Sequence, residues 1–260
     1  MSAPTLGTVP RRSWPARELR GVVVSEIRKA LSTSAWWALL IPVVLFSLVE
    51  GSINPEGDFS ALSLYLSLGF ATIFAMLFGV VCATAEYRHR TIATSYLVVA
   101  QRPRLTVAKM ILAAIVGAGY ALISTAVTVA GLLISGTAST DELPSLLQAG
   151  AGAVLVFALW AMLGVGVGTL IGKRLLAVLA SVVYLIVEPI VVMLVDRDGL
   201  TTYLPASSAD TALGGLTDGA KFGGLFGVAQ PWWLMLLVFA GWVVVVGLGG
   251  AVAAQRRDIA

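Results

Sequence analysis

The residue with the clearest chemical potential in this 260-residue chain is Glu188, a carboxylate well inside a long apolar run. A charged group buried in hydrocarbon is costly, so such residues are uncommon and often carry function. Pro189 follows at once and predicts a kink, because proline cannot donate a helical hydrogen bond. We expect Glu188 either to line a substrate path or gate, or to hydrogen-bond to a neighbouring helix as a structural group.

Few other residues have the type and spacing of a reactive site. His89 is the only histidine and Cys82 the only cysteine, so we expect no metal site and no internal disulfide. The chain also has no glycine-rich phosphate loop ending in Gly-Lys-Ser or Gly-Lys-Thr. We therefore expect no catalytic residue and no cofactor bound by this chain, which argues against an enzyme.

Composition indicates the environment of the chain. Apolar residues make up 58% of it, charged residues 12%, and the mean hydropathy is +0.92. A soluble domain of this size could hardly sustain these values. Spanning the hydrocarbon takes about 20 apolar residues, and six runs approach or exceed that length. The spans are expected at residues 33–49, 62–85, 107–134, 146–172, 177–195 and 232–254.

The distribution of charge predicts how these spans are oriented. Fifteen of the 17 Lys and Arg residues lie in four segments that alternate with the others, and only Arg197 and Lys221 lie in the segments between. Because short cytoplasmic loops retain Lys and Arg, we expect both termini in the cytoplasm. The net charge of +3 comes from these anchoring residues, so we expect no nucleic-acid partner.

Two further helical segments are expected outside the spans. Residues 17–32 carry apolar and charged positions on opposite helix faces, which is typical of an amphipathic helix in the inner headgroup layer. Residues 196–230 are too polar and glycine-rich to cross a bilayer, and Asp210 to Leu216 could form a short helix that dips into the outer leaflet. Residues 1–16 are expected to be a mobile cytoplasmic terminus.

Three glycines in the fourth span lie on one helix face. Gly164, Gly168 and Gly172 recur at every fourth residue, a spacing that lets another backbone approach closely. We expect helix packing along this stripe, against a neighbour that belongs either to the same chain or to a second one.

The segment between the second and third spans carries the most specific pattern. It reads Glu86-Tyr-Arg-His-Arg-Thr-Ile and later Gln-Arg-Pro-Arg, and Lys109 opens the third span. This resembles the signature region of type-2 ATP-binding-cassette (ABC) exporter permeases, in which a Glu closes the second span, a Thr follows, and a cytoplasmic helix ends near Pro-x-Arg. The matching positions are Glu86, Thr91 and Pro103. Arg90 departs from the pattern, because many relatives have Gly before the Thr.

The resemblance implies an all-α polytopic membrane fold. A single transmembrane domain over residues 17–260 would comprise an amphipathic elbow helix, six transmembrane helices, a cytoplasmic coupling helix and an external re-entrant-like segment between spans five and six. The coupling helix would dock on a separate ATPase subunit that binds ATP and Mg²⁺. Its expected contact residues are Glu86, Tyr87, Arg88, Thr91, Ile92, Tyr96 and Pro103.

The resulting hypothesis is a permease subunit of an ABC exporter in a bacterial cell membrane. The resemblance implies a second permease copy or a paralogue, and the apolar spans favour a hydrophobic or amphipathic substrate such as a drug, an antibiotic or a lipid-like molecule. Two alternatives remain: a membrane enzyme acting on lipids, and a non-transporting immunity or sensor component. The enzyme would need several intramembrane polar groups at one place, whereas Glu188 stands alone in its span.

Overall fold

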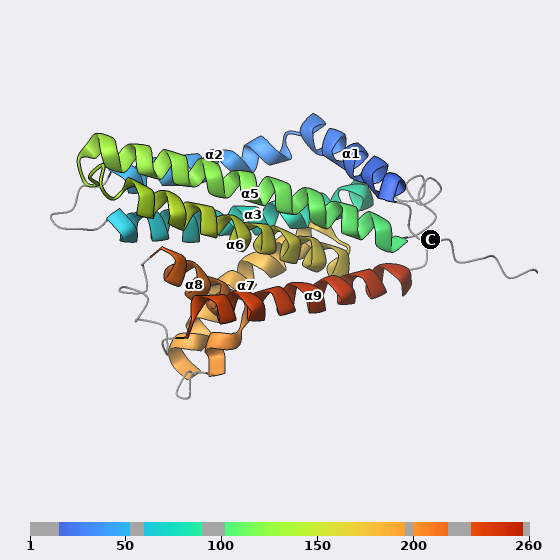
Figure 1. Cartoon of the computed structure of the whole chain (residues 1–260). Coiled ribbons are helices and arrows are strands. Elements are labelled where there is room, and N and C mark those ends of the chain that lie inside the picture. The colour runs from blue at the N-terminus through green and yellow to red at the C-terminus, as the bar shows by residue number, and fades with distance from the viewer. Residues whose placement is uncertain (1–15, 53–59, 90–101, 196–199, 218–229, 257–260) are drawn as a thin grey trace, which may run out of the picture.

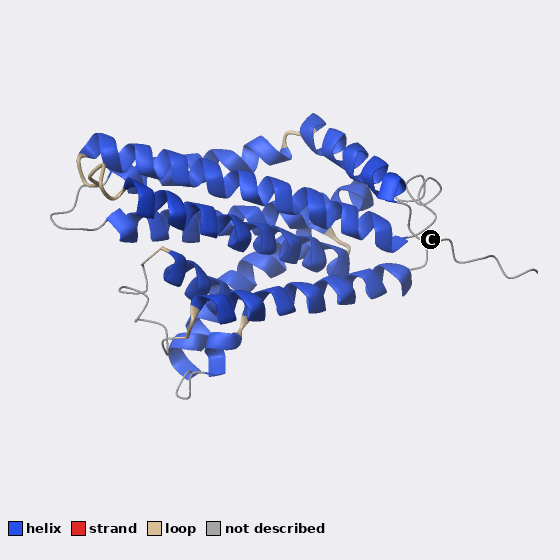
Figure 2. Cartoon of the chain, in the orientation of Figure 1, coloured by secondary structure: helices blue, strands red, loops and turns tan. Residues whose placement is uncertain are grey.

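The computed structural model describes residues 16–52, 60–89, 102–195, 200–217 and 230–256. Every regular element within these ranges is a helix (Figures 1 and 2). The elements are α1 (Ala16–Ser32), α2 (Ala35–Ser52), α3 (Ser60–His89), α5 (Arg102–Ser135), α6 (Leu143–Ile171), α7 (Arg174–Val195), the 3₁₀ helix η1 (Leu200–Tyr203), α8 (Pro205–Leu216) and α9 (Trp232–Arg256).

Six of these helices are long and apolar enough to cross a membrane, namely α2, α3, α5, α6, α7 and α9. This confirms the predicted all-α fold with six spans. Several helices extend beyond the expected spans: α3 continues from Ala85 to His89, and α5 begins at Arg102. Apolar runs define only the part of a helix that needs hydrocarbon, so hydropathy underestimates helices that project out of it.

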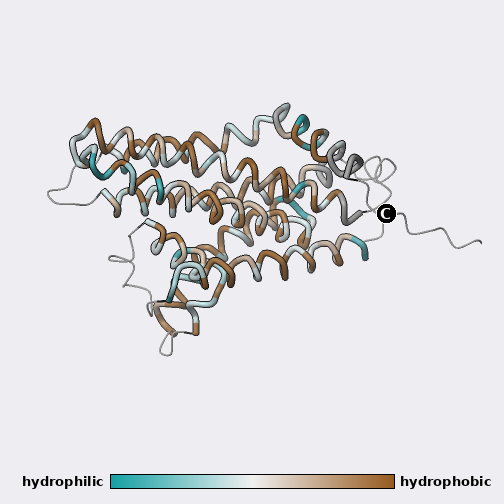
Figure 3. The backbone as a smooth tube through the Cα atoms, in the orientation of Figure 1, coloured by the Kyte–Doolittle hydropathy of each residue, from teal (hydrophilic) through white to brown (hydrophobic). Residues whose placement is uncertain are grey.

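The long helices run roughly along one common axis (Figure 1). The end of α3, the start of α5 and the end of α9 lie at one end of the bundle, which we call the basic end because the basic segments adjoin it. The α5–α6 connection and α8 lie at the other end, the α8 end. Figure 3 shows hydrophobic residues along the long helices and hydrophilic ones mainly near their ends. Helices that cross a membrane need this distribution, with apolar residues along their length and polar residues near their ends.

Helix α6 lies at the centre of the bundle and packs against α3, α5 and α9. Gly164 faces the backbone of α3 at Met76, and Gly168 faces Ala83 of the same helix. The neighbour along this part of the glycine stripe is therefore in the same chain. Gly172 has another place: it ends α6 with φ of 70°, and its N–H donates to the carbonyl of Gly168 at 2.9 Å. Glycine adopts this left-handed conformation without steric cost.

Helix α1 is attached to the bundle by a buried charge cluster that the sequence reasoning did not anticipate. The carboxylate of Glu26 accepts hydrogen bonds from Lys29 at 2.7 Å and from Lys109 of α5 at 2.9 Å. Lys109 and Glu26 are both buried. Burial alone would raise the pKa of Glu26, but the charge of Lys109 and the bonds from both lysines hold it below its ordinary value.

Candidate functional site

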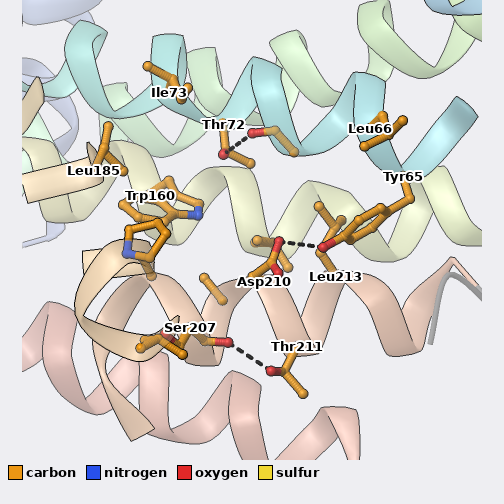
Figure 4. Close-up of a pocket in the computed structure, with 16 residues that line it drawn as sticks. Tyr65, Leu66, Thr72, Ile73, Trp160, Leu185, Ser207, Asp210, Thr211 and Leu213 are labelled. Carbon is orange, nitrogen blue, oxygen red and sulfur yellow. Dashed lines mark hydrogen bonds between the residues drawn. The ribbon is translucent and has the colours of Figure 1, made fainter. Parts of the chain in front are cut away.

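A cavity of about 350 Å³ lies where α3, α6, α7 and α8 meet (Figure 4), toward the end of the bundle at which Figure 1 shows α8. Most of its wall is apolar, with Ile73 from α3, Trp160 from α6 and Leu185 from α7 among the lining residues. Polar groups enter from α3 and α8. They are Tyr65, Thr72, Ser207, Asp210 and Thr211. An apolar hollow with a few convergent polar groups is the usual form of a small-molecule site.

The start of α8 is fixed by a side chain from another helix. Its N-cap residue, Leu204, supplies no side-chain acceptor, and Pro205 occupies the first helical position. The carboxylate of Glu188 in α7 accepts hydrogen bonds from the N–H groups of Ala206 at 3.2 Å and Ser207 at 2.7 Å. It also accepts a bond from the Ser207 hydroxyl at 2.9 Å. These N–H groups have no partner within the helix, and a negative charge there is favoured by the helix dipole.

Glu188 is 4% exposed, and Tyr184, one turn earlier in α7, donates a further hydrogen bond to its carboxylate. Glu188 does not line the cavity, but Ala206 and Ser207, which it binds, do. Its contacts therefore position α8 from behind the cavity wall. Of the two expected roles, the contacts are those of a group bonded to a neighbouring helix, and participation in a gate stays a prediction.

Asp210 is the acidic group that faces the cavity, and the sequence reasoning did not select it. Its Oδ1 atom accepts a hydrogen bond from the Tyr65 hydroxyl at 2.7 Å (Figure 4). Burial raises the pKa of the Asp210 carboxyl, while the bond from Tyr65 acts in the opposite direction. Asp210 belongs to α8, which is not one of the six spans. The sequence reasoning placed Asp210 only at the start of a possible short helix, because its partner Tyr65 is 145 residues away in the sequence.

Aromatic and aliphatic side chains complete the wall. Trp160 is buried and packs against Phe239 of α9, with ring centroids 5.1 Å apart. No Lys, Arg or His is among the lining residues found in the described part of the chain. The cavity therefore combines one acid and several hydroxyls with a mostly apolar surface, which suits a molecule with a small polar part and a larger apolar part.

The expected coupling residues lie at the basic end or outside the described residues. Glu86, Tyr87 and Arg88 belong to the last turns of α3, and Pro103 to the first turn of α5, but the positions of their side chains are not described. The other three, Thr91, Ile92 and Tyr96, fall in 90–101, outside the described residues. What the structure does bring together is α3 and α5, which pack against each other and border this segment.

Six helices that are long and apolar enough to span a membrane, with a short helix inserted between the fifth and the sixth beside a partly open cavity, define a multi-pass membrane protein. Residues 26–188 match the family model described as ABC-2 family transporter protein, and the chain belongs to this family. The resemblance inferred from the sequence is thereby confirmed. No curated protein matches the chain significantly. The match ends at Glu188, so α8 and α9 lie beyond the matched residues.

Proposed function

We propose that this chain is the permease subunit of an ABC exporter that moves a hydrophobic or amphipathic substrate across a bacterial cell membrane. The observation that carries the proposal is the family match over residues 26–188, which makes the chain a membrane component of an ABC-2 transporter. Export, as the direction, follows from the resemblance to exporter permeases. Both termini would lie in the cytoplasm, because short cytoplasmic segments retain Lys and Arg.

Energy would come from ATP hydrolysed by a separate subunit docked on the segment from Glu86 to Pro103. In support, α3 and α5 both project past their apolar parts toward this segment. Rigid helices that leave the membrane can transmit a displacement from a partner into the bundle. The coupling is a free-energy linkage between two distant sites through an element with two positions.

Helix α3 would be the mechanical link to the substrate. It is continuous over 30 residues and so about 45 Å long. In its first half, Tyr65 and Ile73 line the cavity, and its last turns carry Glu86. A movement of this helix at the basic end would therefore alter the cavity at the α8 end. A second permease copy or paralogue would complete the transporter around a twofold axis.

The test is to uncouple the two subunits at the proposed docking segment. Thr91→Arg and Tyr96→Arg, alone and together, should reduce co-purification of the ATPase subunit and its ATP turnover, because bulky charge in a packed interface is costly to desolvate. Thr140→Arg, at an exposed position in the α5–α6 connection, adds the same charge at the opposite end and should leave both unchanged. Retention of the ATPase and full turnover in the double variant would refute this docking site.

A further inference from the structure

We propose, building on the export function above, that the cavity beside Asp210 binds the positively charged group of a lipophilic cation, such as a protonated amine carried on an apolar ring system. Asp210 would supply the counter-charge, and the aromatic and aliphatic walls would hold the apolar body. The substrate class of the exporter would then be amphipathic cations.

The first support is the incomplete pairing of the Asp210 carboxylate. One oxygen accepts the bond from Tyr65, and no other hydrogen bond or ion pair to this carboxylate occurs among the described residues. The group nevertheless lies in a largely apolar wall. The cost of burying part of a carboxylate in such a wall is offset by a proton or by a cationic partner. The described residues of the wall supply no cationic partner for Asp210. A positively charged ligand would supply one.

The second support is the chemistry of the surrounding wall. In the view of Figure 4, Asp210 lies between Trp160 and Tyr65, whose rings both belong to the cavity lining. Cations are attracted to the faces of such rings, and most strongly to Trp. Ile73, Leu185 and Leu213 provide apolar surface for the remainder of a ligand. A cavity of about 350 Å³ is within the size range of small-molecule sites.

Ligands of other charge fit less well. An anion would face the Asp210 carboxylate with no lining Lys or Arg in the described residues to compensate. A neutral ligand would leave the carboxyl in need of a proton. A cation satisfies the carboxylate directly, and salt screens an ion pair inside the cavity less than one on the exposed surface.

Binding should be coupled to proton release. Burial raises the pKa of Asp210, so in the empty cavity the carboxyl keeps its proton to a higher pH than an exposed aspartate does. When a cation binds, the O–H bond of the acid breaks, the proton leaves to solvent, and the carboxylate pairs with the ligand, so one positive charge replaces another. Neighbouring titratable groups come from several elements packed on α8, while α6 has none. They are Tyr65 of α3, Tyr184 and Glu188 of α7, and Tyr203 of η1. Arg256, in the last turn of α9, lies at the basic end of the bundle, away from Asp210.

Ethidium binding to the purified full-length chain in lipid nanodiscs tests the proposal. Ethidium is a permanent cation, so its own charge does not change with pH, and Nile red serves as the uncharged apolar probe. In the wild type, ethidium affinity should rise with pH as Asp210 loses its proton. In Asp210→Asn it should fall at least tenfold and lose its pH dependence, while Nile red affinity stays within about twofold.

Two further variants separate the site from general electrostatics and from misfolding. Asp141→Asn removes an exposed acid in the α5–α6 connection and should bind ethidium as the wild type does. Tyr65→Phe keeps the ring but removes the hydrogen bond that favours the carboxylate, so the pH dependence should move to higher pH. Because Tyr65→Phe leaves the acid in place, it tests the site even if Asp210→Asn folds poorly.

Several outcomes would overturn the proposal. They are unchanged ethidium affinity in Asp210→Asn, an equal loss in Asp141→Asn, or an unchanged pH dependence in Tyr65→Phe. None of these bears on whether an ATPase subunit docks at the basic end. The exporter function is tested separately by ATPase co-purification with the Thr91 and Tyr96 variants, so the two proposals can fail independently.

Discussion

At the scale of single residues, two carboxylates near the α8 end have different roles. Glu188 is saturated by N–H and O–H donors and holds the first turn of α8. Asp210, on α8 itself, has one donor among the described residues and faces the cavity. A carboxylate with full hydrogen bonding is a stable structural group, whereas one with a single partner retains capacity for a ligand. The hydrogen bonds that each carboxylate accepts therefore distinguish the structural group, Glu188, from the candidate ligand-binding group, Asp210.

Replacing Glu188 by Gln should loosen α8. The amide is uncharged and has a single acceptor oxygen, so the N–H groups of Ala206 and Ser207 lose part of their cap. We expect a loss of folding free energy on the order of 1–3 kcal/mol and faster amide hydrogen exchange in 205–216. Thermal unfolding and hydrogen exchange of the purified chain measure these effects. Glu50→Gln, in α2, is the matched control, and equal exchange in both variants would contradict the capping role.

Acid should weaken the attachment of α1. The pKa of Glu26 is lower in the folded chain than its ordinary value of 4.5, so its contribution to stability is complete above that value and is lost as pH falls through the folded pKa. The wild type should lose thermal stability more steeply than Glu26→Gln as pH falls below about 4.5. Parallel stability profiles for the two proteins between pH 3 and pH 7 would show that the cluster contributes nothing.

At the scale of elements, the sequence predicted what depends on composition and missed what depends on contacts. Six spans and the amphipathic helix over 17–32 follow from hydropathy and helical period, and the structure has helices there. The helix expected at Asp210 to Leu216 begins earlier, at Pro205, because Glu188 caps it from α7. Bonds between distant residues, such as Glu26 with Lys109 and Tyr65 with Asp210, leave no local pattern in the sequence.

The packing of α3 on α6 depends on glycines of α6. Their spacing in the sequence predicted a packing stripe but did not identify the neighbouring helix. A Cβ atom at Gly164 would collide with the carbonyl group of Met76 in α3, so Gly164→Ala should separate the helices and lower the melting temperature. At Gly119 in α5 a Cβ meets nothing within 4 Å, so Gly119→Ala should be neutral or stabilise the helix by about 0.5–1 kcal/mol. Similar melting temperatures for the two variants would refute close packing at Gly164.

At the scale of the whole molecule, the two proposed sites lie at opposite ends of the helix bundle. The segment proposed to dock the ATPase adjoins the basic end, while the Asp210 cavity lies toward the α8 end. The spans between them, above all α3, are continuous helices that join the two ends. An exporter needs this separation, because the energy source and the release side lie across the membrane from each other. The orientation of the two ends therefore decides whether the proposed mechanism is possible.

Cysteine labelling of intact cells measures that orientation. In a Cys82→Ala background, a cysteine replacing exposed Thr140 at the α8 end should react with a membrane-impermeant maleimide added outside. A cysteine replacing exposed Lys173, between α6 and α7, should react only after the cells are permeabilised, because short basic connections stay in the cytoplasm. The permeabilised sample controls for steric access at both positions. Labelling of Lys173→Cys in intact cells, with Thr140→Cys protected, would invert the topology and place the proposed docking segment outside, where no ATP-hydrolysing partner could reach it.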